Sequence, residues 1–329
     1  MTARSSLIYL AILFFPFMKN ASLVIDLTGV IKMRKFILGF ALCIVSLYGA
    51  AAVSDPRLLA LHELFTTLGA TVEPTYEAMN EHAQRHWLRK PGQERWQMDS
   101  SHHQDNAKTV KPILRRLGML GRLDPTVYDP EYAIVLGATV FRMRTRMQHM
   151  LELMAGGRFA PKKIIVLVGE RPLDPEQEAE SVLLDTRFIR DGWTRPDSLP
   201  TNEAEAARFV WDQLPKPDCA ASILVTFIAA PMLGKHGKRI RPSTIDTVNT
   251  WLQTSPKPGR IVAFSNNPYV PYQHETVRLG LLPSGWFRTG STLETVGSAA
   301  SEDIDMASML DNVARYIFTI VQTQHASTG

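Results

Sequence analysis

Two apolar runs decide the fold, Ala133-Ile-Val-Leu-Gly-Ala-Thr139 and Lys163-Ile-Ile-Val-Leu-Val-Gly169. Both are short, rich in β-branched residues and followed by a glycine, which is typical of parallel strands buried on both faces. Similar runs recur at 222–228 and 261–264. Helical patterns separate the runs. The alternation predicts an α/β fold, a three-layer, Rossmann-like parallel sheet with helices on both faces.

The segments between the expected strands carry helical signals. After the first strand, an apolar stripe at helical spacing is formed by Met143, Met147, Met150, Leu151 and Met154. After the second strand, Asp174-Pro175-Glu176-Gln177 resembles an N-cap with proline in the first turn, which predicts the start of a helix. Four further helices are expected at about 202–213, 243–253, 269–279 and 304–321.

Residues 53–125 are expected to form a helical preface, and 126–329 the α/β domain. The first preface helix follows an Asp-Pro start signal and has apolar residues at helical spacing, namely Leu58, Leu61, Leu64, Phe65 and Leu68. Two more helices are expected at about 74–89 and 109–120.

Residues 1–52 are expected to be a leader. The apolar run 36–48 follows a basic stretch, 32–35, and precedes Gly-Ala-Ala-Ala at 49–52. This is the pattern of a secretory signal peptide over about 33–52, with Met33 as the expected initiator. The protein is therefore expected to be exported, either periplasmic or secreted, and to meet a membrane only through its leader. The alternative is an uncleaved leader that anchors the chain to the inner membrane.

The excess of basic over acidic residues in the chain lies in this leader. The 329 residues contain 36 Lys and Arg against 32 Asp and Glu, a net charge of +4. The leader holds five of the basic residues and one acidic residue, which leaves 31 of each in the remainder. An electrically balanced domain argues against nucleic acid as a partner.

Ligands of doubly wound folds bind beyond the carboxyl ends of the strands, so we sought polar residues there. Gly137 and Thr139 follow the first strand, and Arg142 and Arg146 lie four residues apart on the next helix. A glycine turn, a helix start and two guanidiniums predict an anion cradle. The alternative is that both arginines lie on a solvated helix edge. Neither a GxGxxG nor a P-loop motif occurs.

Further polar residues are expected at the same edge of the sheet. They follow strands or begin helices: Gly169, Glu203, Ser243, Thr244, Asn249 and Ser265. Glu203 and Asp246 are the candidate general bases, although Ser243-x-x-Asp246 also fits a capping box. His82 and His86 lie four apart, but Glu81 precedes the pair instead of following its first member as in HExxH. No metal site is predicted.

The strand-helix block resembles the YdcF/SanA/ElyC-like family, a bacterial domain of unknown function. The best match is 133–169, where a strand ending in Leu-Gly precedes an Arg-led helix and a second strand ending in glycine. Shorter matches are Thr201-Asn-Glu-Ala204, Ser243-Thr-Ile-Asp-Thr-Val-Asn249, Ile261-Val-Ala-Phe-Ser265 and Arg278-Leu-Gly-Leu281. The resemblance covers about 131–290 and implies a Rossmann-like fold in an envelope setting, with no settled reaction.

The chain departs from the family pattern in its expected crevice. Val168 stands where the family has Ser, and Phe264 where it has Thr. The family's His and Arg after Ser265 are replaced by Pro268 and the Pro271-Tyr272 region. The chain is thus interpreted as a divergent member.

Three hypotheses follow for function. The first is an exported domain that binds a small anionic or nucleotide-like ligand at the strand ends. The second is a hydrolase or transferase with Glu203 or Asp246 as general base, and the third is a degenerate, non-catalytic envelope scaffold. The two ligand hypotheses require Arg146, Glu203 and Asn249 to converge in one cleft. The sequence names neither a cofactor nor a protein partner.

Overall fold

The computed structural model describes residues 55–329, apart from 100, 102, 236–237, 302 and 329. The expected leader, with its signal peptide and Met33 start, lies outside the described residues. Among the described helices, none combines the length and the apolar character that a membrane crossing requires.

Five strands form one parallel sheet in the order β3-β2-β1-β6-β7, and two more pair as an antiparallel hairpin. The sheet strands are β1 (Tyr132–Leu136), β2 (Lys163–Gly169), β3 (Leu224–Ala230), β6 (Ile261–Asn266) and β7 (Leu293–Ser298). The hairpin strands are β4 (Leu233–Lys235) and β5 (Lys238–Ile240). Because the strand order reverses between β1 and β6, the sheet has a topological switch point there.

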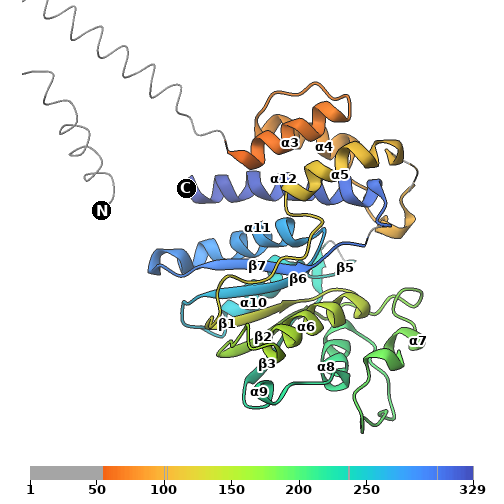
Figure 1. The fold of residues 1–329 in the computed structure, drawn as a ribbon, viewed down its shortest axis with the longest axis vertical. Coiled ribbons are helices and arrows are strands. Elements are labelled where there is room, and N and C mark those ends of the chain that lie inside the picture. Colours follow the sequence, from red (N-terminus) through yellow and green to blue (C-terminus); the bar gives the residue numbers. More distant parts are fainter. Residues whose placement is uncertain (1–54, 100, 102, 236–237, 302, 329) are drawn as a thin grey trace, which may run out of the picture. The chain divides into compact units, whose positions relative to one another are not determined.

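Helices cover both faces of the sheet (Figure 1), which confirms the predicted Rossmann-like, three-layer α/β fold. One face packs on α6 (Val140–Ala155), α8 (Glu203–Gln213) and α9 (Asp218–Ala221). The other face packs on α10 (Thr244–Leu252) and α11 (Val270–Leu281).

Strand β1 shows why these runs are apolar throughout. Ala133 and Val135 point into the core beneath α6, whereas Ile134 and Leu136 point into the core beneath α10 and α11. All four side chains are buried, since successive residues of a strand face opposite sides of the sheet. A central strand with two covered faces therefore needs no polar alternation.

The first three α-helices of the described residues pack with the C-terminal helix in a separate helical layer (Figure 1). These are α3 (Pro56–Thr67), α4 (Tyr76–His86), α5 (Ala107–Arg116) and α12 (Met306–Thr328). Leu61, Leu64 and Phe65 of α3 share one buried cluster with Val313 and Ile317 of α12. The sequence predicts each helix, but not that the two ends of the domain form one core.

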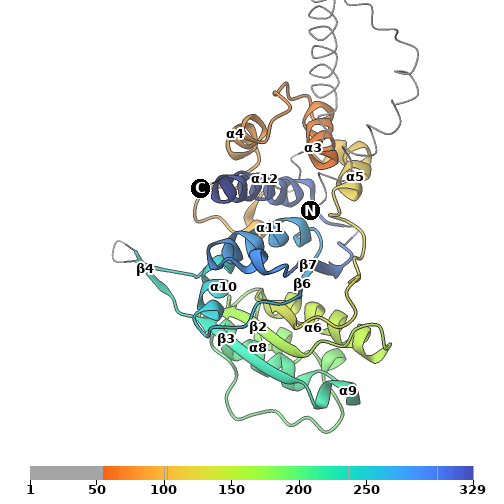
Figure 2. The same cartoon turned by 90° about the vertical axis from the view of Figure 1, so that its left-hand side faces the viewer.

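The helix predicted from Asp174 is wrong. Residues 175–177 form a turn in which Asp174 Oδ1 accepts the amides of Glu176 at 3.0 Å and Gln177 at 2.8 Å. The next helix, α7 (Glu180–Leu183), starts later. The carboxylate of Glu178 binds groups outside this segment, which holds the chain in a loop. Sequence analysis also missed β7 and the β4–β5 hairpin, which projects from the body of the domain (Figure 2).

The shared core of the helical layer predicts the effect of two leucine substitutions on the same helix. Leu64 is fully buried, and L64A should lower the free energy of unfolding by about 2–5 kcal/mol because it leaves a cavity. Leu59 is 51% exposed, and L59A should change the free energy of unfolding by less than about 0.5 kcal/mol. Urea denaturation followed by circular dichroism measures both. Equal losses would contradict the assignment of this core.

Candidate functional site

A pocket of about 960 Å³ opens at the carboxyl ends of β1 and β2. Its charged lining is dominated by arginine. The arginines are Arg89, Arg95, Arg142, Arg146, Arg171, Arg239, Arg241 and Arg315. The carboxylates are Glu94, Asp174, Glu178 and Glu203. Eight cationic against four anionic side chains make the pocket electropositive, although basic and acidic residues are equal in number in the chain after the leader.

Arg146 lies on α6 and is only 2% exposed. Its Nη1 donates to the carbonyl oxygens of Leu136 at 2.7 Å and Gly137 at 2.8 Å, and its Nε donates to Asn266 Oδ1 at 3.0 Å. Every one of these acceptors is neutral. Burial, and then the nearby charge of Arg142, lower the pKa of Arg146 to about 9. The guanidinium remains charged at neutral pH, and Nη2 has no hydrogen-bond partner among the described residues.

Arg142 lies one turn before Arg146 on α6. Its guanidinium carbon lies 4.6 Å from the ring centroid of Tyr269, and that of Arg95 lies 4.4 Å from the same centroid. Cation–π contact holds both arginines at the pocket wall without neutralising them. Within the part of the chain that the structure describes, neither Arg142 nor Arg146 has a carboxylate within ion-pair distance.

Three other arginines of the pocket, Arg89, Arg95 and Arg315, share one buried carboxylate. Asp311 of α12 is fully buried, and its Oδ2 lies 3.1 Å from Nε of both Arg95 and Arg315 and 3.9 Å from Nη1 of Arg89. These arginines lower the pKa of Asp311 against the opposing effect of burial. Asp311 thus fixes Arg95 beside Tyr269, and the helical layer supplies one wall of the pocket.

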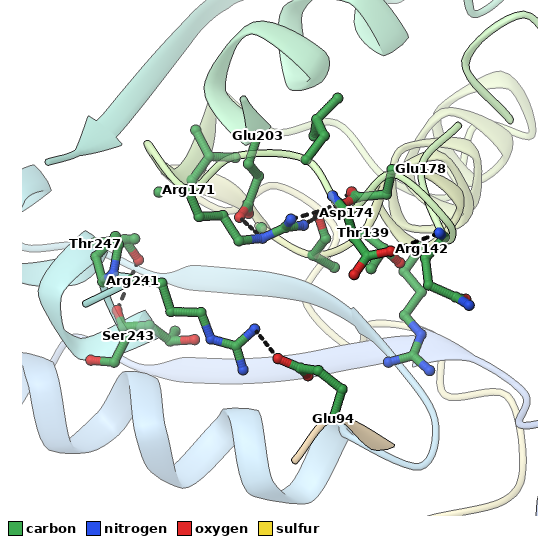
Figure 3. Close-up of a pocket in the computed structure, with 18 of the residues that line it drawn as sticks. Glu94, Thr139, Arg142, Arg171, Asp174, Glu178, Glu203, Arg241, Ser243 and Thr247 are labelled. Carbon is green, nitrogen blue, oxygen red and sulfur yellow. Dashed lines mark hydrogen bonds and ion pairs between the residues drawn. The ribbon is translucent and has the colours of Figure 1, made fainter. Parts of the chain in front are cut away.

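On the opposite wall, Arg171 is shared by two buried glutamates (Figure 3). Its Nη1 and Nη2 donate to Glu178 at 2.7 and 3.0 Å, and its Nε lies 2.8 Å from Glu203 Oε2. Glu178 Oε1 also accepts the amide of Val140 at 3.0 Å. The first amide of α6 is therefore already bound by a carboxylate, so the helix start contributes less to an anion cradle than the sequence suggested.

Glu203 is the pocket residue with the most unusual carboxylate. It is 6% exposed, and burial raises its pKa to about 7; Glu178 adds to the rise, whereas Arg171 and Arg146 oppose it. Its Oε1 lies against Gly137, where an added Cβ would come within 2.1 Å of that oxygen. Oε1 has no hydrogen-bond partner among the described residues, so this acid–base group faces the pocket beside Arg146.

The structure brings most of the predicted site residues to this pocket. Its lining includes Gly137, Thr139, Arg142, Arg146, Gly169, Glu203, Ser243 and Thr244. The burial of Arg146 excludes the alternative of a solvated helix edge for that residue. Gly169 has a packing role, since an added Cβ would lie 2.5 Å from the ring of Pro242.

Three predicted residues lie outside the pocket lining. Asp246 caps α10 and does not line the pocket: its Oδ2 accepts from Ser243 N at 2.7 Å and from Ser243 Oγ at 2.6 Å, as the capping-box alternative expected. Asn249 is exposed on a different side of α10, and Thr247 lines the pocket instead. Ser265 is fully buried in the interior. The three-residue convergence that the ligand hypotheses required therefore fails, because only Arg146 and Glu203 share the pocket and Asn249 does not. A ligand proposal must rest instead on the residues that do line the pocket, above all Arg142 and Arg146.

Sequence reasoning missed four residues that shape the pocket. Arg171 follows the second strand, and its position just after a strand end is the sequence signal that could have identified it as a pocket residue. Arg95 and Tyr269 come from the helical layer and from the residue before α11, and Arg241 from the end of the hairpin. No local motif marks these three.

No cluster of His, Cys, Asp and Glu that could hold a metal ion is found in the described part of the chain. The rings of His82 and His86 stack with their centroids 4.4 Å apart. Their spacing therefore reflects packing on α4.

The contact between Gly137 and Glu203 predicts a stability effect. In G137A the new methyl group would meet the carboxylate of Glu203 and come within 2.8 Å of the backbone oxygen of Leu167. We expect a loss of about 1–3 kcal/mol in the free energy of unfolding. G121A is the control, since an added Cβ meets nothing within 4 Å there. Thermal denaturation compares the two, and an unchanged midpoint for G137A would contradict the close approach.

No protein-family model, curated protein or solved structure matches the chain. The geometry and charge of the pocket therefore carry the functional inference.

Proposed function

We propose that this chain binds a small anionic ligand, of phosphate-bearing or nucleotide-like chemistry, between Arg142 and Arg146. The observation that carries the proposal is a pair of neighbouring guanidiniums, one of them buried, with no carboxylate partner among the described residues. Burying a charge without a counter-charge is costly. An anion would supply the counter-charge and accept from Nη2 of Arg146 in a charge-assisted hydrogen bond.

The surroundings support an anionic group on a larger molecule. The pocket volume of about 960 Å³ lies near the upper end of the usual range for small-molecule sites. Tyr269, Tyr272 and Phe141 add aromatic surface to a lining of charged, polar and aliphatic residues. The position beyond the strand ends, beside the switch point between β1 and β6, is where ligands of this fold class bind.

The cellular setting is part of the same proposal. The basic and apolar pattern of 33–52 supports export, and the motifs of 131–290 support a distant relation to the YdcF/SanA/ElyC-like family. Expression of the full chain with a C-terminal tag, followed by fractionation and N-terminal sequencing, tests export. A mature chain that begins near residue 53 in the periplasm or medium is the expected result, and an intact cytoplasmic chain would contradict it.

A second candidate function is a hydrolase or transferase that uses Glu203 as its acid–base group. The raised pKa and the open Oε1 of Glu203 favour it, because a general base works best when its pKa lies near the operating pH. Loss of turnover in E203Q with retained ligand binding would support this candidate. A third outcome, a pocket that binds no anion, would support the degenerate scaffold.

Anion binding is tested with inorganic phosphate and sulfate by isothermal titration calorimetry. We expect R142Q, which removes a partly exposed cation from the rim, to weaken binding by about tenfold or more, since a charge-assisted hydrogen bond contributes about 1.5–3 kcal/mol. R187Q is the matched control, because Arg187 is a 75% exposed partner of Asp185 outside the pocket. Equal affinities in R142Q and wild type would contradict the proposed position.

The raised pKa of Glu203 predicts a pH dependence. A bound anion adds negative charge near Glu203 and favours its protonated form, so binding should take up a proton. The affinity for sulfate, which does not titrate in this range, should therefore rise as the pH falls from about 9 toward 7, by up to about tenfold per unit, and level off below 7.

Calorimetry in buffers of different ionisation enthalpy measures the proton uptake directly. Between about pH 6 and 8, where Arg146 with its pKa of about 9 stays almost fully charged, E203Q should bind sulfate with almost no proton uptake and almost no dependence on pH. Uptake that persists in E203Q would contradict the assignment of the proton to Glu203.

A further inference from the structure

We propose that the pocket holds a second anion subsite at Arg241, and that its ligand therefore carries two separated anionic groups. This inference rests on the proposed function, because it takes the site at Arg142 and Arg146 as the first of the two. It names the class of ligand: an elongated dianion whose first group binds the α6 side and whose second group binds the hairpin side.

The two groups of cations come from different walls of one pocket. Arg142 and Arg146 belong to α6, whereas Arg239 and Arg241 belong to β5 and to the segment that leads into α10. Figure 3 shows the side chains of Arg142 and Arg241 entering the pocket from opposite sides. Pro242 packs on Gly169 at the end of β2 and so fixes the backbone that carries Arg241.

Glu94 supplies an internal counter-charge to this second group. Its Oε1 lies 3.4 Å from Nη1 of Arg241, and its Oε2 lies 4.0 Å from Nη2 of Arg89 (Figure 3). The pair joins the helical layer to the segment before α10 across the pocket. Because about half of the Arg241 side chain is exposed, the pair is only weakly stabilising, and an incoming anion can replace Glu94 at modest cost.

Two neighbouring hydroxyl groups, those of Ser243 and Thr247, already donate to other groups of the protein. Ser243 Oγ donates to Asp246 at 2.6 Å, and Thr247 Oγ1 donates to the carbonyl of Thr244 at 2.8 Å. The guanidinium of Arg241 is therefore the group of this wall best placed to recognise charge. The carboxylates of Glu203 and Glu178 lie on a third side and disfavour an anion there.

The size of the pocket also argues against a single small anion. A cavity of about 960 Å³ holds a ligand many times the volume of one phosphate group. A molecule with one anionic end would leave Arg239 and Arg241 beside empty space. A molecule with two ends would use both groups of cations, and linking the two binding events raises affinity through effective concentration.

The test uses the full chain and two kinds of probe, methylphosphonate with one anionic group and α,ω-alkanebisphosphonates of increasing chain length. By calorimetry, a bisphosphonate of matching length should bind at least about tenfold more tightly than methylphosphonate, well beyond the roughly twofold gain from having two equivalent ends. R241Q should remove this gain, and it should weaken methylphosphonate binding far less than it weakens bisphosphonate binding, because Arg142 and Arg146 still bind the single anionic group. E94Q should raise the affinity for the bisphosphonate several-fold, because it removes the competing charge.

Each outcome bears on one of the two proposals. If no bisphosphonate binds more tightly than methylphosphonate, or if R241Q weakens both probes equally, the second subsite is wrong while the first stands. If neither probe binds, the proposed function fails and this inference fails with it. R187Q serves again as the control for removal of a positive charge outside the pocket.

Discussion

The buried guanidinium of Arg146 ties α6 to the two strands between which the sheet reverses its order. It donates to the last carbonyls of the β1 segment, at Leu136 and Gly137, and to Asn266 at the end of β6. One side chain thereby binds two backbone acceptors at the end of β1 and a side-chain acceptor at the end of β6. It does so with neutral groups only, so the fold places a positive charge at the mouth of the sheet that has no ion-pair partner among the described residues, although Glu203 is near enough to interact with it electrostatically.

The other charged side chains of the pocket lie on either side of the buried guanidinium of Arg146. Asp311 gathers Arg89, Arg95 and Arg315 on one side, and Arg171 is divided between Glu178 and Glu203 on the other. The first arrangement neutralises the arginines of the helical layer only in part. The second leaves one carboxylate with a raised pKa and a free oxygen. The wall with Arg142 and Arg146 lacks a counter-charge, and the neighbouring Glu203 can gain or lose a proton near neutral pH. Such a site is suited to bind an anion together with a proton.

Local pattern was sufficient to predict four of the five sheet strands and most of the helices, because strands buried on both faces and amphipathic helices have recognisable patterns of apolar residues. It missed the edge strand β7, which is only partly buried. It also placed Gly137 and Glu203 at one edge, since the first directly follows a strand and the second begins a helix, and Arg146 on the helix that follows the same strand. It could not supply Arg95, Tyr269 or Arg241, which reach the pocket through tertiary packing. Asp246 is a residue that the sequence offered in two roles, as a helix cap and as a general base. The two roles look alike in sequence, and the bonds of Asp246 to Ser243 show that it caps the helix.

The most direct measurement is the position of a heavy oxyanion in a crystal of the protein. Tungstate resembles phosphate in shape and charge, and its anomalous signal locates it without reference to the surrounding density. The account predicts a peak within hydrogen-bond distance of Nη2 of Arg146 and beside Arg142. A pocket with no peak in crystals saturated with tungstate, or a peak only at arginines outside the pocket, would contradict it.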